Sequence, residues 1–393
     1  MLNRRLLRIK IYQGLYAMHN LQLRTIEQGK ALIANQFFVP FEDRTEEYDA
    51  DVDAARTVLA TSIFEEYLGK LQLPHEVSTD LEPAVFSVIV KALRFYREEL
   101  NEVHHTQFRN IVSETKNLSL EYARLLWFIR ELVNQQREDE TRKGARFIDN
   151  EPSKEHLLKF ANNPIVSALE SFPQLEVAAA RNNLGYEPTE GFFRQLFKEH
   201  IKSDEKYKTY IALEEATLED HLNFFKHLVK QLLFTYVPSV SFFQANSITW
   251  EEDADVIKNL SIKTLKVIAA SPAEVPTLMA LATDWEDDQV FMDTLYFKTW
   301  EERAALDTNL EAVSKNWDPS RLALSDELLL KMAITEFKHC NSIPVKVTIN
   351  EYVDIAKGYS TPNSGTFING MLDSLADKLK EAGEIKKSGK GML

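Results

Sequence analysis

The feature that most constrains this chain is the scarcity of residues that break helices. Only 12 glycines and 13 prolines occur among 393 residues, and Leu, Ala, Glu and Lys dominate the long segments between them. These four residue types are good helix formers, whereas glycine and proline disfavour the interior of a helix. No segment shows a convincing alternation of apolar and polar residues of the kind that predicts a strand. The sequence therefore predicts an all-α protein.

Apolar residues recur at helical spacing in many segments. The predicted helices cover residues 4–35, 50–73, 82–105, 118–142, 154–160, 191–202, 218–234, 251–269, 284–300, 304–316, 325–340, 345–358 and 363–382. Pro83 is expected in the first turn of the third helix, and Ser119 is a candidate cap of the fourth. The polar stretch 134–154 lacks apolar periodicity and is predicted to be a linker or exposed loop. A weak echo between the surroundings of Trp250 and Trp317 leaves open a partial internal repeat or merely a shared helical period.

Composition excludes several classes of protein. A hydrophobic content of 44% with 27% charged residues is typical of a globular protein and excludes disordered and fibrous chains. The single cysteine, Cys340, cannot form an internal disulfide, which favours a reducing compartment. We find no apolar run long enough to span a membrane and no pattern of a signal peptide in residues 1–19. A cytoplasmic location is therefore expected.

Basic charge is concentrated at the N-terminal end, although the net charge of the chain is −14. The first 26 residues contain no acidic residue and five basic residues, Arg4, Arg5, Arg8, Lys10 and Arg24. On a helix, Arg4, Arg5, Arg8 and Tyr12 fall within an arc of about 100°. Arginine pairs with phosphate oxygens, and an aromatic ring can stack on an unpaired base, so this face suits single-stranded RNA. The alternative is a solvated helix whose arginines pair with acidic residues of the chain.

The sequence shows no signature of catalysis. No phosphate loop, G-x-G-x-x-G, H-E-x-x-H or G-x-S-x-G pattern is present. His104 and His105 are adjacent, but neighbouring residues on a helix point about 100° apart, so we interpret them as a solvated helix end rather than a metal site. Cys340 follows an apolar run and is expected to be a small buried residue. We therefore predict a protein that is not an enzyme and has no catalytic residue, metal site or cofactor.

Three motifs in the last 70 residues carry a family resemblance. The sequence reads I-P-V-K-V-T-I-N-E at 343–351, A-K-G-Y at 356–359 and F-I-N-G-M-L-D at 367–373. Their order and spacing closely resemble the C-terminal half of the bacterial NusB family of transcription antitermination factors. R-R-L-L-R at 4–8 and Q-G-L-Y at 13–16 resemble the N-terminal basic helix of that family.

The resemblance implies a NusB-like helical bundle of two subdomains with an additional inserted helical region. Residues 1–35 would then form the N-terminal basic helix, and residues 281–382 the C-terminal part of the NusB-like domain. Residues 41–280 would be a helical insertion, with a possible partial repeat at 217–270. Residues 383–393 are expected to form a basic, flexible tail.

For function, the resemblance implies binding of single-stranded, boxA-type RNA in ribosomal RNA leader transcripts together with the ribosomal protein NusE. Such binding would support transcription and maturation of ribosomal RNA, with other Nus factors and RNA polymerase as indirect partners and no membrane involved. The alternative is a protein-only helical scaffold or a recruitment module in ribosomal RNA processing.

The resemblance also assigns site residues. Arg4, Arg5 and Arg8 match the RNA-contacting arginines of the family, and Phe367 with the loop Asn363–Ser364 matches its second contact region. Together with Tyr12, these residues form the predicted RNA site. The loop departs from the family where Asn363 replaces a common Asp and where Gly365–Thr366 replaces a common His-Lys pair.

Overall fold

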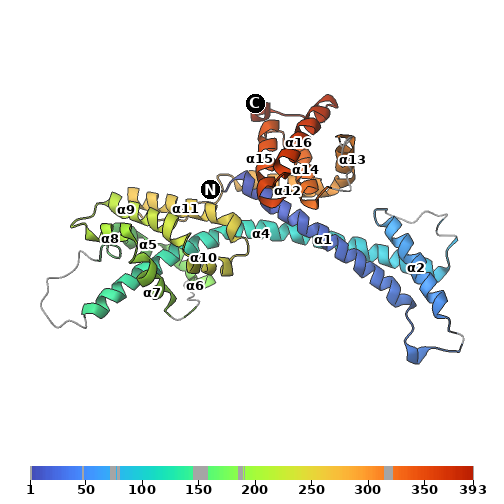
Figure 1. The fold of residues 1–393 in the computed structure, drawn as a ribbon, viewed down its shortest axis with the longest axis horizontal. Coiled ribbons are helices and arrows are strands. Elements are labelled where there is room, and N and C mark those ends of the chain that lie inside the picture. Colours follow the sequence, from blue (N-terminus) through green and yellow to red (C-terminus); the bar gives the residue numbers. More distant parts are fainter. Residues whose placement is uncertain are drawn as a thin grey trace. The chain divides into compact units, whose positions relative to one another are not determined.

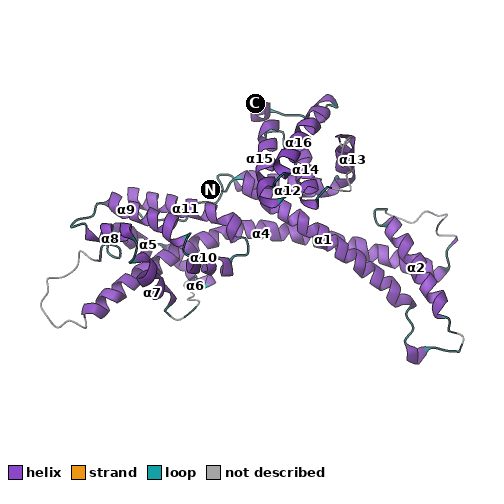
Figure 2. Ribbon diagram, in the orientation of Figure 1, coloured by secondary structure: helices purple, strands orange, loops and turns teal. Residues whose placement is uncertain are grey.

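The computed structural model describes residues 2–46, 48–70, 77, 80–144, 158–184, 189, 191–313 and 322–392. Helices make up the regular structure of this part of the chain, and it contains no strand (Figure 2). The prediction of an all-α fold is therefore confirmed. Over the same residues, no helix combines the length and the apolar character needed to cross a bilayer.

The predicted N-terminal helix is confirmed as α1 (Arg4–Phe37). A short 3-10 turn, η1 (Phe41–Asp43), follows Pro40, and α2 (Ala50–Tyr67) comes next along the chain. The Asp49 side chain accepts hydrogen bonds from two backbone amides in the first turn of α2, which fixes the start of that helix.

The longest helix is α4 (Pro83–Gly144), with 62 residues. Two helices were predicted here, at 82–105 and 118–142, with a cap at Ser119 and a linker from 134. Those boundaries are wrong, because the helix is continuous through Ser119 and through residues 134–144. The physical reason is visible in the sequence, since no glycine or proline occurs between Pro83 and Gly144. Residues 145–154 of the predicted linker lie outside the described part of the chain.

Contacts between Cα atoms divide the chain into two compact units, which are described separately. Unit 1 comprises residues 1–7 and 114–288, and unit 2 comprises residues 8–113 and 289–393. The helices of unit 1, beside the second half of α4, are α5 (Pro164–Glu170), α6 (Pro173–Asn182), α7 (Phe192–Leu196), α8 (Glu205–Ala212), α9 (Leu218–His227), α10 (Val237–Asn246) and α11 (Trp250–Ala270). Two π-helical turns, η3 (Phe197–Ile201) and η4 (Leu228–Leu233), extend α7 and α9.

The core of unit 1 is rich in phenylalanine. Phe160 packs against Phe197, Phe224 and Phe225 with ring centroids 5.4–6.3 Å apart. The predicted helices at 191–202, 218–234 and 251–269 are confirmed, whereas the short helices α5, α6, α8 and α10 were not predicted. The predicted helix at 154–160 is described only from residue 158, and this end of it forms a turn. Trp317, one half of the possible repeat, lies outside the described residues.

Unit 2 contains the bundle formed by the last third of the chain (Figure 1). Its helices are α12 (Trp285–Glu301), which begins in the sequence of unit 1, α13 (Arg303–Val313), α14 (Leu324–His339), α15 (Val345–Tyr359) and α16 (Ser364–Glu381). All five were predicted. Most side chains of α14 are buried, which identifies it as the central helix of this bundle.

The C-terminal segment differs from the expected flexible tail. The Lys387 Nζ donates hydrogen bonds to the backbone carbonyls of Glu336 and Cys340 at the end of α14. The Ser388 amide donates to the Asn341 carbonyl over 3.0 Å, and a short 3-10 turn, η6 (Gly389–Met392), follows. A cation beside the last carbonyls of a helix is favourable, so this tail caps α14.

The boundaries of the two units differ from those of the predicted domains. Residues 41–113, assigned to the expected insertion, fall in unit 2 together with residues 289–393. Residues 1–7, assigned to the N-terminal basic helix, fall in unit 1. The helices α1 and α4 each contribute residues to both units.

Candidate nucleic-acid interface

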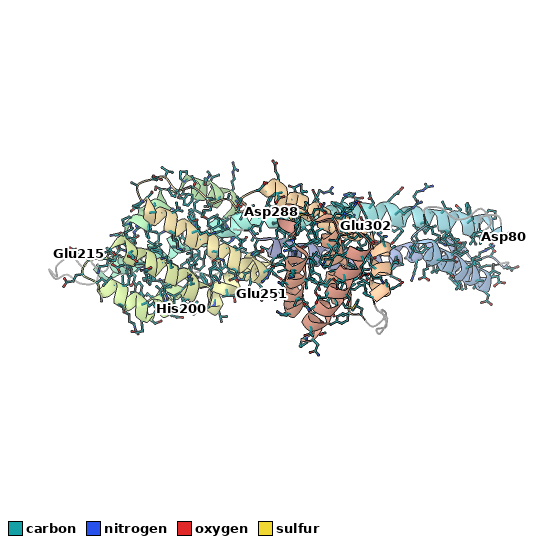
Figure 3. The ribbon with its side chains drawn as sticks, turned by 90° about the horizontal axis from the view of Figure 1, so that it is seen from above. Asp80, His200, Glu215, Glu251, Asp288 and Glu302 are labelled. Atoms are coloured by element: carbon teal, nitrogen blue, oxygen red, sulfur yellow. The ribbon has the colours of Figure 1, made fainter. Side chains whose placement is uncertain are left out.

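The three predicted arginines of α1 have different environments. In unit 1, Arg4 is partly exposed and forms an ion pair with Asp287, with 2.5 Å between Nη2 and Oδ2. Its Nε lies 3.9 Å from a carboxylate oxygen of Asp288, in the first turn of α12 (Figure 3). Arg5, the next residue, is exposed. Arg4 therefore joins α1 to the start of α12.

In unit 2, Arg8 is buried, with only 2% of its surface exposed. Its Nε and Nη2 donate to the two carboxylate oxygens of Glu336 over 2.8 and 2.7 Å. Glu351 lies 3.6 Å away, and the guanidinium also lies over the Phe291 ring. The prediction that Arg8 belongs to a solvent-facing arginine row is therefore wrong. This guanidinium is enclosed in the bundle and cannot reach an external phosphate.

The network around Arg8 satisfies a buried carboxylate. Besides Arg8, Glu336 accepts hydrogen bonds from Thr348 over 2.7 Å and from Tyr352 over 3.3 Å. Burial alone would lower the pKa of the Arg8 guanidinium, but the hydrogen bonds and negative charge of Glu336 raise it overall. Burial, followed by the charge of Glu336, raises the pKa of Tyr352. Arg8 thus holds α1 against α14 and α15.

Tyr12, the predicted stacking residue, is also largely buried. Its ring meets the ring of Tyr359 edge-on, with centroids 5.5 Å apart, and 5% of the residue is exposed. Burial, the neighbouring Tyr16 and the charge of Asp326 raise the pKa of Tyr12 to about 12. Tyr16 is 43% exposed and its ring lies 6.5 Å from that of Tyr12. Tyr16 is thus the aromatic residue of this pair that a base can reach.

Sequence reasoning missed Tyr16 as a site residue. The signal was its spacing, because residues four positions apart are neighbours on a helix surface. Tyr12 lies closer to the apolar stripe formed by Leu7, Ile11 and Leu15, all of which are buried.

The start of α16 brings the second predicted contact region into unit 2. Ser364 is buried and donates a hydrogen bond to Asp326 over 2.9 Å, and its hydroxyl oxygen lies 3.0 Å from that of Ser360. Asn363 is exposed and occupies the N-cap position, although its side chain makes no capping hydrogen bond. Phe367, one turn later, is half-buried. Of this loop, Asn363 and Phe367 can meet a ligand, and Ser364 holds the loop on α14.

Gly365 accounts for one departure of this loop from the family pattern. A Cβ at residue 365 would lie 3.3 Å from Cγ of Lys357 and 3.7 Å from the carbonyl oxygen of Val353. The start of α16 therefore packs closely on α15, and a side chain at 365 would require a shift of Lys357.

The geometry of unit 2 therefore joins two segments that are distant in the sequence. Tyr12 of α1 contacts Tyr359 at the end of α15, and Asp326 of α14 both influences Tyr12 and accepts from Ser364. Tyr16 and the exposed start of α16 extend from this junction. We call the exposed Tyr16 and Asn363, together with the half-buried Phe367, the aromatic edge of unit 2.

Two other candidate groups do not form sites. His104 is buried, stacked between Tyr296 and Trp300 at centroid distances of 4.8 and 5.2 Å, so the prediction of a solvated residue is wrong for it. His105 is exposed, as predicted. Cys340 is buried, as predicted. Within the described residues, no group of three or more His, Cys, Asp or Glu side chains could hold a metal ion.

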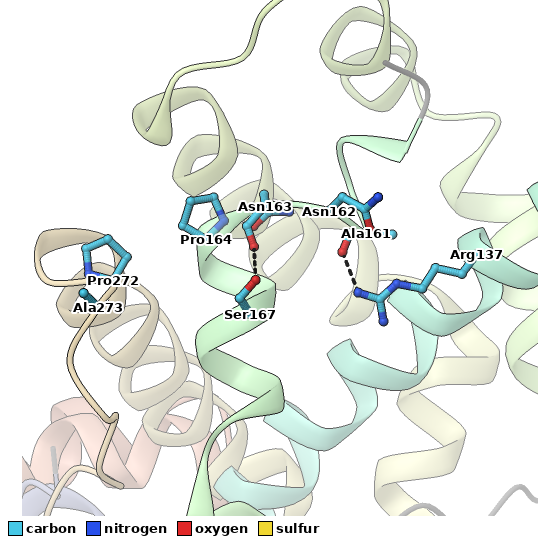
Figure 4. A pocket seen from close by; sticks show the side chains of 8 residues that line it. All are labelled: Arg137, Ala161, Asn162, Asn163, Pro164, Ser167, Pro272 and Ala273. Atoms are coloured by element: carbon cyan, nitrogen blue, oxygen red, sulfur yellow. Dashed lines mark hydrogen bonds between the residues drawn. The ribbon is translucent and has the colours of Figure 1, made fainter. Parts of the chain in front are cut away.

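Unit 1 contains an open pocket of about 590 Å³ (Figure 4). Arg137 lines it, but its guanidinium is already engaged with Glu170 and with the Ala161 carbonyl, the latter at 2.8 Å. Asn163 on the same wall caps α5 with its side chain. The polar groups of this pocket therefore serve the fold of unit 1.

The model of the NusB family matches residues 263–377. The match contains all three C-terminal motifs and the start of α16. Residues 263–377 are thus similar to the NusB family. The matched segment begins within α11 and includes α12 to α15 and most of α16.

Curated relatives support this assignment over part of the chain. A "Transcription antitermination protein NusB" from Salinibacter ruber is 41% identical over 106 residues, which cover 27% of this chain and 63% of that protein. Proteins of the same name from Chloroherpeton thalassium and Syntrophus aciditrophicus are each 40% identical. Those alignments cover 22% and 24% of this chain, and 42% and 58% of the two relatives. The chain thus spans less than two thirds of each of these relatives. No solved structure matches it.

Proposed function

We propose that this protein is an RNA-binding transcription antitermination factor that acts without catalysis. The observation that carries the proposal is the NusB domain at residues 263–377, because its motifs build the loop and helix start at the aromatic edge of unit 2. Relatives that are 40–41% identical to part of this chain are named transcription antitermination proteins.

The proposed ligand is a single-stranded, boxA-type element of a ribosomal RNA leader, bound together with the ribosomal protein NusE. At the aromatic edge, Tyr16 and Phe367 offer ring faces on which unpaired bases can stack. Asn363 offers a side-chain amide that can donate to and accept from a base edge. Exposed arginines such as Arg5 would contact the phosphates of the RNA.

Asp326 limits how this surface can bind. Its carboxylate accepts a hydrogen bond from Ser364 and its charge acts on Tyr12, beside the aromatic edge. A phosphate placed directly above it would be repelled, so base stacking rather than phosphate pairing should dominate there. This arrangement favours binding that is modest alone and stronger when a basic partner protein contributes phosphate contacts.

We also propose that most of residues 41–262 is an addition to the NusB domain rather than part of it. The family match starts only at residue 263, whereas α2, α4 and most of unit 1 precede it. These helices would give the protein a function in addition to RNA binding, and the NusB motifs would not depend on them.

The test is fluorescence anisotropy with a labelled boxA-type RNA and a scrambled RNA of the same composition, each with and without NusE. The variants Tyr16→Ala and Phe367→Ala should weaken binding of the boxA-type RNA. Phe38→Ala is a matched control, because Phe38 is an exposed aromatic residue of unit 2 outside the proposed site. Equal affinity for the two RNAs, with NusE present, would refute the proposal.

A further inference from the structure

The outer face of α2 has the wrong composition for a helix that meets only water. On this face Val58 is 70% exposed, Leu59 47% and Val52 43%, and Ala55 and Ser62 are also exposed. The opposite face carries Ala60, Phe64 and Tyr67, which are buried in a core of unit 2. A surface helix is normally polar on its solvent side, whereas α2 is apolar on both sides.

Acidic residues frame this outer face. Asp51 lies at its N-terminal end, and Glu65 and Glu66 lie at its C-terminal end. Arg56 is the single basic residue of α2, and its guanidinium is held by Asp53 and Glu82. Glu65 pairs with Lys30 of α1 over 2.5 Å, while Glu66 reaches Lys70 only at 3.9 Å.

The connection that leads into α2 has the same character. Residues 41–53 contain seven acidic residues and one basic residue. Phe38 and Phe41 in this region are 66% and 83% exposed. The basic residue is Arg44. Its guanidinium lies over the rings of Phe41 and Tyr48 and donates a hydrogen bond to the Val39 carbonyl, so it is engaged within the same segment.

We propose that the outer face of α2, formed by Val52, Ala55, Val58, Leu59 and Ser62, docks a basic amphipathic segment of another protein. The apolar stripe would receive the apolar side chains of that segment, and the acids at both ends would pair with its lysines or arginines. Charge complementarity decides the kind of occupant. RNA and an anionic membrane would be repelled by the acidic frame.

A second copy of this chain is a weaker candidate for the same reason. In a symmetric dimer through this face, the acidic frames of both copies would be brought together, and like charges across an interface disfavour association. The proposal goes beyond RNA binding, since α2 lies outside the matched NusB segment.

The experiment uses the full chain and three labelled helical peptides. The first carries a stripe of Leu and Ala flanked by Lys, the second has Glu in place of each Lys, and the third has the composition of the first with its stripe scrambled. Fluorescence anisotropy should show the first peptide binding at least about tenfold more tightly than the other two, with affinity that falls as salt rises. No binding of the first peptide, or equal binding of all three, would overturn the proposal.

Variants then locate the binding. Val58→Lys/Leu59→Lys adds charge to the stripe and should weaken binding of the first peptide at least about tenfold. Val58→Gln/Leu59→Gln, which adds no charge, should weaken it less and guards against a folding defect in the lysine variant. Val177→Lys on α6 is the matched control, because Val177 is 50% exposed and lies in unit 1. Unchanged binding in both double variants would overturn the assignment.

Sedimentation of the wild-type chain without peptide tests the competing occupant. We expect the same mass for the wild type and for Val58→Lys/Leu59→Lys. A wild-type dimer that the double variant abolishes would assign the face to a second copy and overturn the proposal. None of these measurements involves RNA, so their failure would leave the proposed RNA binding intact.

Discussion

Two parts of unit 2 use the same kinds of residue for opposite purposes. Around Arg8, a cation, a carboxylate and Tyr352 are enclosed and fully paired. At the aromatic edge, Tyr16 and Asn363 are exposed. Both parts belong to α1 and the C-terminal helices. The comparison teaches that an arginine or tyrosine in a family-like pattern can be structural or ligand-facing, and that burial separates the two.

The largest effect is expected from removing the buried cation. Arg8→Ala leaves the Glu336 carboxylate buried without its ion partner, which should cost about 3–5 kcal/mol of unfolding free energy. Urea denaturation measures this loss. Arg5→Ala is the matched control and should change stability by no more than about 0.5 kcal/mol. An Arg8→Ala protein as stable as the wild type would remove the distinction between the two regions.

The next effect concerns the aromatic edge. Tyr16→Ala should weaken binding of the boxA-type RNA by about 1–3 kcal/mol, because one stacking platform is lost. The free energy of unfolding should change little, since the ring is 43% exposed. Anisotropy and urea denaturation, performed on the same variant, measure the two quantities. A variant that loses stability but keeps its affinity would place Tyr16 with the structural group.

The dependence of stability on pH tests a second buried group of unit 2, the imidazole of His104. Burial, followed by the charge of His105, lowers the pKa of His104 to about 4. The unfolded chain takes up this proton near pH 6.5, so stability is full above pH 6.5 and falls between pH 6.5 and pH 4. We expect a loss on the order of 1–2 kcal/mol after allowance for solvent screening. Thermal or urea melts at several pH values measure it.

His104→Phe and His105→Asn provide the matched pair for this titration. The first should flatten the pH dependence in this window, because the titrating group is removed. The second should preserve most of it, since burial, the larger cause of the lowered His104 pKa, remains. An unchanged pH profile in His104→Phe would show that other groups cause the acid destabilisation.

The smallest effect is expected at Arg5. If its guanidinium contacts one phosphate, Arg5→Ala should reduce the slope of log affinity against log salt by about 0.7, the value for one contact with a single strand. Binding isotherms at several salt concentrations measure this slope. The same slope in the variant and the wild type would place Arg5 outside the RNA interface.

Much of the fold could be predicted from sequence because helical periodicity and helix breakers are local signals. They gave α1, α11 and the helices from α12 to α16. The continuity of α4 was missed, since apolar periodicity fades after residue 134 even though charged helix formers continue. Short helices such as α5 span fewer than three turns and leave too few apolar positions to show a period.

The environment of the site residues could not be predicted in the same way. A helical wheel places Arg8 about 20° from Leu15, at the edge of the buried stripe, so its direction was ambiguous. The ion partner that decides the matter, Glu336, lies 328 residues later in the chain. The spacing that selected Tyr12 likewise contained no information on Tyr359, which covers it.

Each unit is assembled from two separate stretches of chain. The two units are therefore completed one after the other during synthesis. During synthesis the last residue of unit 1, Asp288, is made before any residue of α13 to α16. Arg8 is made 328 residues before Glu336, and it must remain solvated until Glu336 emerges. Unit 1 can therefore close while the chain is still growing, whereas α14 and α15 can pack against α1 only after they have followed it out of the ribosome.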